Sequence, residues 1–166
     1  LRALKILKKD FPNIHLIVIG NMKKNGHTER LIKKLRLKNN VIFKSNLSKE
    51  GIRELYASSS IAIVSSLYEG FGYPVIEAMS CEIPLIATNI SSIPELVSDY
   101  AKLIKPRNEE MLSNSVKEIF LDYSKYIDIA KQGRQHVIQN FNWIKITEEY
   151  EKVISKTIEE YNNANF

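Results

Sequence analysis

Two glutamates flank a glycine-rich turn near the middle of the chain. Glu69 stands before Gly70 and Gly72, and Glu77 follows Pro74, where a helix is expected to begin. A carboxylate accepts hydrogen bonds from paired hydroxyls, such as those of a ribose or a hexose. Glycines allow the backbone to approach a ligand closely. The pattern therefore predicts a site for a ligand that is rich in hydroxyl groups.

The start of the expected helix adds a second set of binding groups. Pro74 suits the first helical position, where its missing amide hydrogen costs nothing. Tyr73 before it is a poor N-cap, because its side chain cannot accept a bond from the first-turn amides. We therefore expect the amides of Val75 and Ile76 to be left for a ligand. A helix N-terminus of this kind favours an anion or a polar oxygen.

Each glutamate also has a simpler interpretation. Glu77, placed in the first helical turn, could merely compensate the helix dipole, and Glu69 could be an exposed loop acid. Taken singly, the two interpretations are equally good for each residue. The combination of two glutamates, two glycines, an aromatic residue and a proline favours a ligand site.

Apolar strand-sized segments alternate with amphipathic segments along the chain. We expect strands at residues 14–19, 41–44, 61–64, 85–87 and 101–104. We expect helices at residues 26–37, 48–58, 74–81, 109–121, 123–139 and 143–161, the end of another over residues 1–9, and a helical turn at 94–97.

This alternation predicts an α/β fold with a parallel, Rossmann-like sheet and helices on both faces. Nearly continuous apolar strands support it, because a parallel sheet is covered on both sides. The 166 residues fit a single domain. Ligands of such sheets bind at the carboxyl ends of the strands, which directs attention to the loops after Gly20, Lys44, Ser66 and Thr88.

Composition excludes several other kinds of protein. Cys81 is the one cysteine, so neither an intrachain disulfide nor a cysteine metal cluster can form, and both facts suit the cytoplasm. His15, His27 and His136 lack the spacing of metal ligands. No apolar run reaches the roughly 18 residues that a membrane span needs.

The net charge of +5 has several possible uses. It could serve a phosphorylated ligand, an anionic membrane surface or nucleic acid. The lysines are spread over several helices without interleaved aromatics, which disfavours nucleic acid. A peripheral membrane contact stays open as an alternative.

The motifs resemble, in order, those of the retaining, family-4 type (group 1) glycosyltransferases with a GT-B fold. Glu69 to Met79 is similar to their E-x7-E signature, with Glu77-Ala78-Met79 at its end. The resemblance covers essentially the whole chain, and its other segments are residues 41–43, 55–57, Ser66, 83–88, 93–97 and 141–143. It implies the C-terminal, nucleotide-sugar-binding lobe of such an enzyme over residues 1–166.

The resemblance also implies roles for individual residues. Glu69 would contact hydroxyls of the donor sugar and is the candidate catalytic residue, and Glu77 would hold the ribose hydroxyls. The backbone around Phe71 would face the sugar and the diphosphate. The full set of implied donor-binding residues is Glu69, Gly70, Phe71, Gly72, Tyr73, Glu77, Asn46, Leu47 and Ser91, with Asn46 and Leu47 beside the base.

Two segments depart from the family pattern. Glu82 stands where a glycine usually precedes the Ile-Pro pair, and Ser91-Ser92-Ile93 replaces a stretch that often holds two glycines. The serine hydroxyls could bind oxygens of the donor or acceptor, or make local turn bonds. Trp143 opens the last helix, residues 143–166, which in this family crosses back toward the N-terminal lobe. We expect Trp143 itself to pack in the core.

A larger difference lies at the start of the chain. By the resemblance, the chain begins after the first strand of the lobe and after the Arg/Lys loop that grips the diphosphate. The missing strand would lie between the strands at 14–19 and 61–64. We therefore expect a fragment that lacks the acceptor-binding lobe, binds donor weakly and turns nothing over.

The function implied by the resemblance is transfer of a hexose from a UDP- or GDP-sugar to a hydroxyl. The acceptor would be a glycan or a lipid-linked precursor in polysaccharide assembly, on the cytoplasmic side of the membrane, with no metal or other cofactor. One alternative is another enzyme of the same fold, such as a nucleotide-sugar epimerase, which the glutamate spacing disfavours. The other is a non-catalytic α/β binding domain such as a receiver, which would need clustered aspartates.

Overall fold

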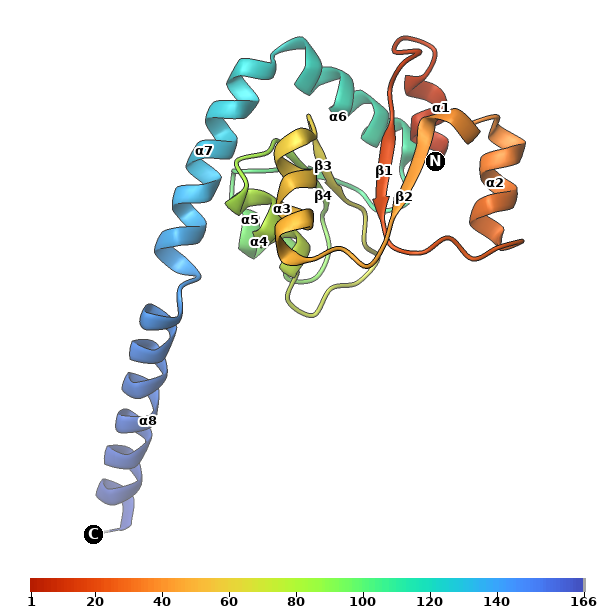
Figure 1. Ribbon diagram of the computed structural model, residues 1–166. Coiled ribbons are helices and arrows are strands. Elements are labelled where there is room, and N and C mark those ends of the chain that lie inside the picture. The colour runs from red at the N-terminus through yellow and green to blue at the C-terminus, as the bar shows by residue number, and fades with distance from the viewer. Residues whose placement is uncertain (166) are drawn as a thin grey trace.

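The computed structural model describes residues 1–165 and has an α/β fold with parallel strands (Figure 1). The strands are β1 (Leu16–Ile19), β2 (Val41–Lys44), β3 (Ala62–Val64), β4 (Leu85–Thr88) and β5 (Lys102–Ile104). The helices are α1 (Arg2–Leu7), α2 (His27–Leu35), η1 (Lys38–Asn40), α3 (Lys49–Ser58), α4 (Tyr73–Ser80), α5 (Ile93–Val97), α6 (Glu109–Leu121), α7 (Tyr123–Asn140) and α8 (Trp143–Asn165). Each expected strand and helix is present, with small shifts at the ends.

The strands form two parallel sheets. β1 pairs with β2, with Leu16 opposite Val41. The other sheet has the order β3-β4-β5, with Ala62 opposite Leu85 and Ile86 opposite Lys102. Among the described residues no strand joins β1 to β3, so the parallel arrangement is divided where the sequence predicts a missing strand. That strand stays a prediction.

Helices cover both faces of the three-stranded sheet, as expected. α4, α5 and α7 pack on one face, and α1 and α6 pack on the other. β4 lies between these layers and is buried at each of its residues. Ala87 belongs to the first layer, with Val75 and Val137, and Ile86 belongs to the second, with Ile119.

The two-stranded sheet is covered on one face, which corrects the expectation of cover on both. α1 and α2 pack on it through Leu4 and Ile32. On the opposite face Ile17, Ile19 and Ile42 are 36%, 49% and 40% exposed. The helix that follows β2 is α3, which packs through Tyr56 against the core of the other sheet and has no buried residue.

The last helix, α8, projects away from the body of the molecule (Figure 1). Trp143 is 81% exposed, and Tyr150, Val153 and Ile154 farther along are also exposed. The expectation that Trp143 packs in the core is therefore wrong, because α8 leaves the domain at its first turn. Its crossing to a second lobe stays a prediction.

Candidate functional site

The central feature is the glycine loop, residues 65–72, which connects β3 to α4. Gly72 is the N-cap of α4 and has a φ of +107°, a conformation that side-chain-bearing residues rarely adopt. A β-carbon at this position would lie 2.9 Å from Cδ1 of Leu96 in α5. At Gly70, by contrast, a β-carbon would have no atom within 4 Å. Position 72 therefore requires a glycine, whereas position 70 has room for a larger residue.

The Glu69 carboxylate is held in place by a hydroxyl of its own loop. Ser66 Oγ donates a hydrogen bond of 2.6 Å to Glu69 Oε1. Glu69 is half-buried rather than fully exposed. A carboxylate oriented in this way keeps free lone pairs for further hydroxyl donors.

The end of β4 and the segment after it each donate one side-chain hydrogen bond to a carbonyl of the glycine loop. Thr88, the buried last residue of β4, donates through Oγ1 to the carbonyl of Ser66 at 2.7 Å. Ser92 donates through Oγ to the carbonyl of Phe71 at 2.7 Å. This bond of Ser92 is neither of the two uses suggested for the serine pair, because it reaches a loop 21 residues away instead of a ligand or a local turn. Ser91 is exposed beside Ser92 with a φ of +45°.

The amides that the sequence predicts to face a ligand, those of Val75 and Ile76, are not free in the structure. α4 begins at Tyr73, one residue earlier than expected, and the amides of Val75 and Ile76 donate to the carbonyl of Gly72 at 2.9 and 3.4 Å. In the described part of the chain, the amides of Phe71, Gly72 and Tyr73 have no such acceptor. The donors available to an anion therefore lie in the glycine loop and at the first residue of α4.

Glu77 is exposed on α4, next to a tyrosine of α3. It lies beyond the first helical turn, which contains no acid, so the helix-dipole explanation of this residue loses its basis. Burial, with a contribution from the Glu77 charge, raises the pKa of Tyr56 to about 12. Tyr56 therefore remains a neutral phenol at physiological pH, and its hydroxyl donates to the carbonyl of Pro74 at 3.4 Å.

Aromatic rings line the other side of the loop. Phe71 and Tyr73 are 41% and 68% exposed, and their ring centroids are 5.1 Å apart. Phe141, after the end of α7, supports Phe71 edge-on at 6.2 Å. The loop thus places a carboxylate, backbone amides and an apolar surface next to one another.

The structure brings most but not all of the candidate residues together. Glu69, Gly70, Phe71, Gly72, Tyr73 and Glu77 lie on the glycine loop and α4, and Ser91 precedes Ser92, which bonds to the loop. The two other candidates, Asn46 and Leu47, follow β2 in the other sheet, and within residues 1–165 no hydrogen bond or ion pair joins them to the loop. Asn46 is exposed with a φ of +54°. Sequence reasoning did not single out the supporting groups Tyr56, Thr88 and Ser92 for these contacts.

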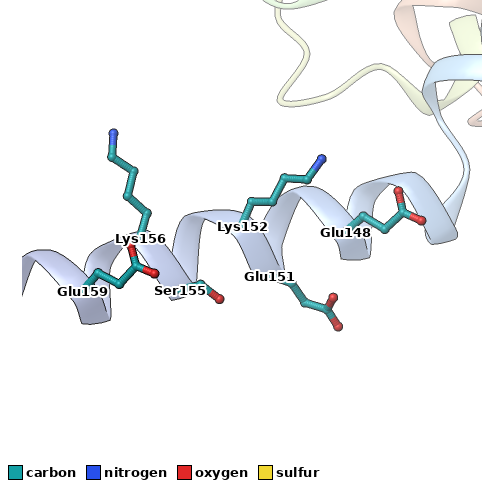
Figure 2. Close-up of a pocket in the computed structure, with 6 residues that line it drawn as sticks. All are labelled: Glu148, Glu151, Lys152, Ser155, Lys156 and Glu159. Atoms are coloured by element: carbon teal, nitrogen blue, oxygen red, sulfur yellow. The ribbon is translucent and has the colours of Figure 1, made fainter.

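A hollow on α8 lies away from these residues. It is lined by Glu148, Glu151, Lys152, Ser155, Lys156 and Glu159. Figure 2 shows that all six belong to one helix, and no second element closes over them. We assign it no ligand.

In residues 1–165, no group of three or more His, Cys, Asp or Glu could hold a metal ion, and no helix is long and apolar enough to cross a membrane.

We predict that Ser92→Ala loosens the glycine loop without unfolding the protein. Loss of a neutral hydrogen bond costs about 1 kcal/mol, so the amides of Val75 and Ile76, which donate to the carbonyl of Gly72 in the loop, should exchange hydrogen about fivefold faster. Ser91→Ala is the matched control, because the hydroxyl of Ser91 makes no bond to the loop. Hydrogen exchange read by mass spectrometry measures both. Equal effects of the two substitutions would contradict the prediction.

Comparison with known proteins adds a family to this geometry. The family model described as "Glycosyl transferases group 1" matches residues 1–136. The chain is 29% identical over 151 residues to the MMP alpha-(1->4)-mannosyltransferase of Mycolicibacterium hassiacum. The matched region covers 87% of this chain and 37% of that protein. The chain therefore spans little more than a third of this relative.

Two solved structures share the fold. Anabaena Alr3699/HepE, in complex with UDP-glucose, is 25% identical with a TM-score of 0.80, over 93% of this chain and 43% of that one. The C-terminal domain of a glycosyl transferase group 1 family protein (LpcC) from Francisella tularensis is 24% identical with a TM-score of 0.73, over 86% of this chain and 77% of that one. The second match covers most of a C-terminal domain, which agrees with the α/β lobe expected from the sequence.

Proposed function

Because this chain belongs to the group 1 glycosyl transferases, we propose that it is the donor-binding lobe of a retaining, family-4 type hexosyltransferase. One observation supports placing the donor site at the glycine loop. The Ser66-oriented carboxylate of Glu69 precedes the amides of Phe71 to Tyr73 in the same loop, which have no acceptor among residues 1–165. A carboxylate for hydroxyls and amides for an anion, side by side, suit a sugar diphosphate.

In this proposal each part of the donor has its own partner. Glu69 accepts hydrogen bonds from the sugar hydroxyls and Glu77 from the ribose. The glycine loop, with the amides of Phe71, Gly72 and Tyr73, faces the diphosphate. Asn46, Leu47 and Ser91 complete the donor site, the first two beside the base. The amide positions differ from those first expected, and the remaining assignments are unchanged.

The resemblance to the retaining family implies the following reaction for this site. The acceptor hydroxyl oxygen bonds to the anomeric carbon on the face from which the diphosphate departs. The bond between that carbon and the phosphate oxygen breaks, and the hydroxyl proton passes to the departing phosphate. The loop amides stabilise the negative charge that develops on the diphosphate, which is usually the largest catalytic contribution in such sites. No cofactor beyond the donor is proposed.

The whole protein would carry more than this lobe. An acceptor-binding lobe, reached by α8, would bind a glycan or a lipid-linked acceptor in polysaccharide assembly at the cytoplasmic side of the membrane. The named relative is a mannosyltransferase and the Anabaena structure holds UDP-glucose. These names support a UDP- or GDP-hexose as the donor class for this chain. By itself the chain is expected to bind donor weakly and to lack turnover.

Donor binding can be tested by the thermal stability of the full-length protein. We expect a UDP-hexose or a GDP-hexose to raise the melting temperature, since a ligand at about 100 times its Kd adds about 2.7 kcal/mol. The free monosaccharide is the control and should add nothing. Product analysis then separates transfer to an acceptor from epimerisation of the donor alone. No shift with either nucleotide class would contradict the proposed function.

A further inference from the structure

The positive charge of the protein is concentrated in its first 44 residues. This segment has 12 of the 24 Lys and Arg and 2 of the 19 Asp and Glu, a net charge of +10. The remaining residues have 12 Lys and Arg and 17 Asp and Glu, a net charge of −5. The modest total of +5 thus hides a strongly basic part and a mildly acidic part.

The fold gathers these cations on one surface. α1 and α2 pack on the same face of the two-stranded sheet, so their polar sides both turn away from it. The helices adjoin, since Lys8 Nζ reaches the carbonyl of Arg36 at 3.4 Å and Lys5 shares a surface groove with Leu35. Figure 1 shows α1 and α2 at one end of the molecule, with α8 projecting at the other. We call the surface formed by α1, α2 and η1 the basic face.

The acids of the segment are already paired, and most of its cations are not. Asp10 pairs with Lys117 of α6 at 2.6 Å, and Glu29 pairs with Lys33 at 2.6 Å. Arg2 approaches Glu109 of α6 at 3.7 Å. Within residues 1–165, nine exposed cations of the segment have no acidic partner within 4 Å: Lys5, Lys9, Lys23, Lys24, Arg30, Lys34, Arg36, Lys38 and Lys44.

We propose that the basic face binds an anionic lipid surface. Nine of the twelve cations in the segment are lysines, which act as point charges on a diffuse anionic layer rather than as bidentate readers of a single group. The segment has no Tyr or Trp, and its two Phe residues, Phe11 and Phe43, are half-buried in the cores, so it offers no exposed Phe, Tyr or Trp ring on which a nucleic-acid base could stack. The acidic remainder would be repelled, which turns the basic face toward the lipid.

Vesicle flotation of the full-length protein tests this contact. We expect binding to vesicles of phosphatidylcholine mixed with phosphatidylglycerol, no binding to phosphatidylcholine alone, and steep weakening by salt, because such charges are screened beyond about 8 Å at physiological ionic strength. Tighter binding to a DNA duplex than to the anionic vesicles at equal salt would overturn the proposal. So would salt-independent binding by the wild-type protein.

A pair of charge-matched variants locates the surface. Replacing Lys5, Lys9, Lys34 and Lys38 by glutamine should weaken vesicle binding at least tenfold, since each basic residue near the lipid contributes up to about fivefold. Replacing Lys49, Lys105, Lys125 and Lys152 by glutamine removes the same charge from exposed positions elsewhere and should have little effect. Equal losses in the two variants would overturn the proposal. Vesicle binding needs neither donor nor acceptor, so its failure is measured separately from failure of the transferase function.

Discussion

Replacing Glu69 by alanine in the full-length protein should lower glycosyl transfer by about 100-fold while the protein stays folded. The substitution removes the carboxylate that we place on the donor-sugar hydroxyls, and a hydrogen bond to a charged group contributes about 1.5–3 kcal/mol. It also leaves the hydroxyl of Ser66 without the partner that it contacts at 2.6 Å. Transfer from a labelled nucleotide sugar gives the rate, and the melting temperature shows whether the fold is kept.

Two further variants show whether the effect belongs to the site. Glu77→Ala should raise the KM for the donor more than it lowers kcat, because contact with the ribose is the same in the ground and transition states. Glu54→Ala on α3 removes an exposed glutamate whose carboxylate makes no bond to the glycine loop and should change neither value. A wild-type kcat and a wild-type KM for the donor in both the Glu69 and Glu77 variants would refute the site assignment.

Local signals explain why the elements could be predicted. Residues 109–121 are helical with the expected bounds, because Asn108 caps the helix by accepting from the amide of Met111 at 2.8 Å. Ser48 caps α3 in the same way through the amide of Gly51. Such caps act over three residues and can be seen in the sequence.

The same reasoning failed where backbone conformation decides the outcome. Because the carbonyl of Gly72 accepts the amides of Val75 and Ile76, the free donors lie earlier in the chain than Pro74 suggests. Proline is compatible with the first turn as a whole, so it does not by itself fix the first helical residue. The left-handed conformation of Gly72 fixes the start of α4 in this protein.

Contacts between distant segments are also absent from a sequence pattern. The bond from Ser92 to Phe71 joins residues 21 apart, and the bond from Tyr56 to Pro74 joins α3 to α4. Similarly, Ile17 and Ile42 each lie in an apolar run of the sequence, whether or not a helix covers them in the fold. Which face is covered depends on where α3 packs, and that is decided by the tertiary structure.

The conformation of Gly72 leads to a second large expected effect. Gly72→Ala should lower the free energy of unfolding by about 1–3 kcal/mol, the usual range for a residue held in a strained conformation. The new methyl group would lie 2.9 Å from Leu96 Cδ1, and Leu96 is buried in the core and cannot easily move. For a domain of this size each kcal/mol lowers the melting temperature by about 2–4 °C. Donor binding should weaken as well, because the amides of Phe71 and Tyr73 move with the loop.

Two matched substitutions separate the causes of this effect. Gly70→Ala changes the same residue type in the same loop, but its β-carbon meets no atom within 4 Å and its φ is not positive, so stability should change little. Adding Leu96→Ala to Gly72→Ala relieves the close contact but not the backbone strain. The double variant also leaves a cavity, so it is compared with Leu96→Ala alone. A residual cost of Gly72→Ala in that background measures the strain at a φ of +107°. If Gly70→Ala destabilised the protein as much as Gly72→Ala, the start of α4 would not depend on this glycine.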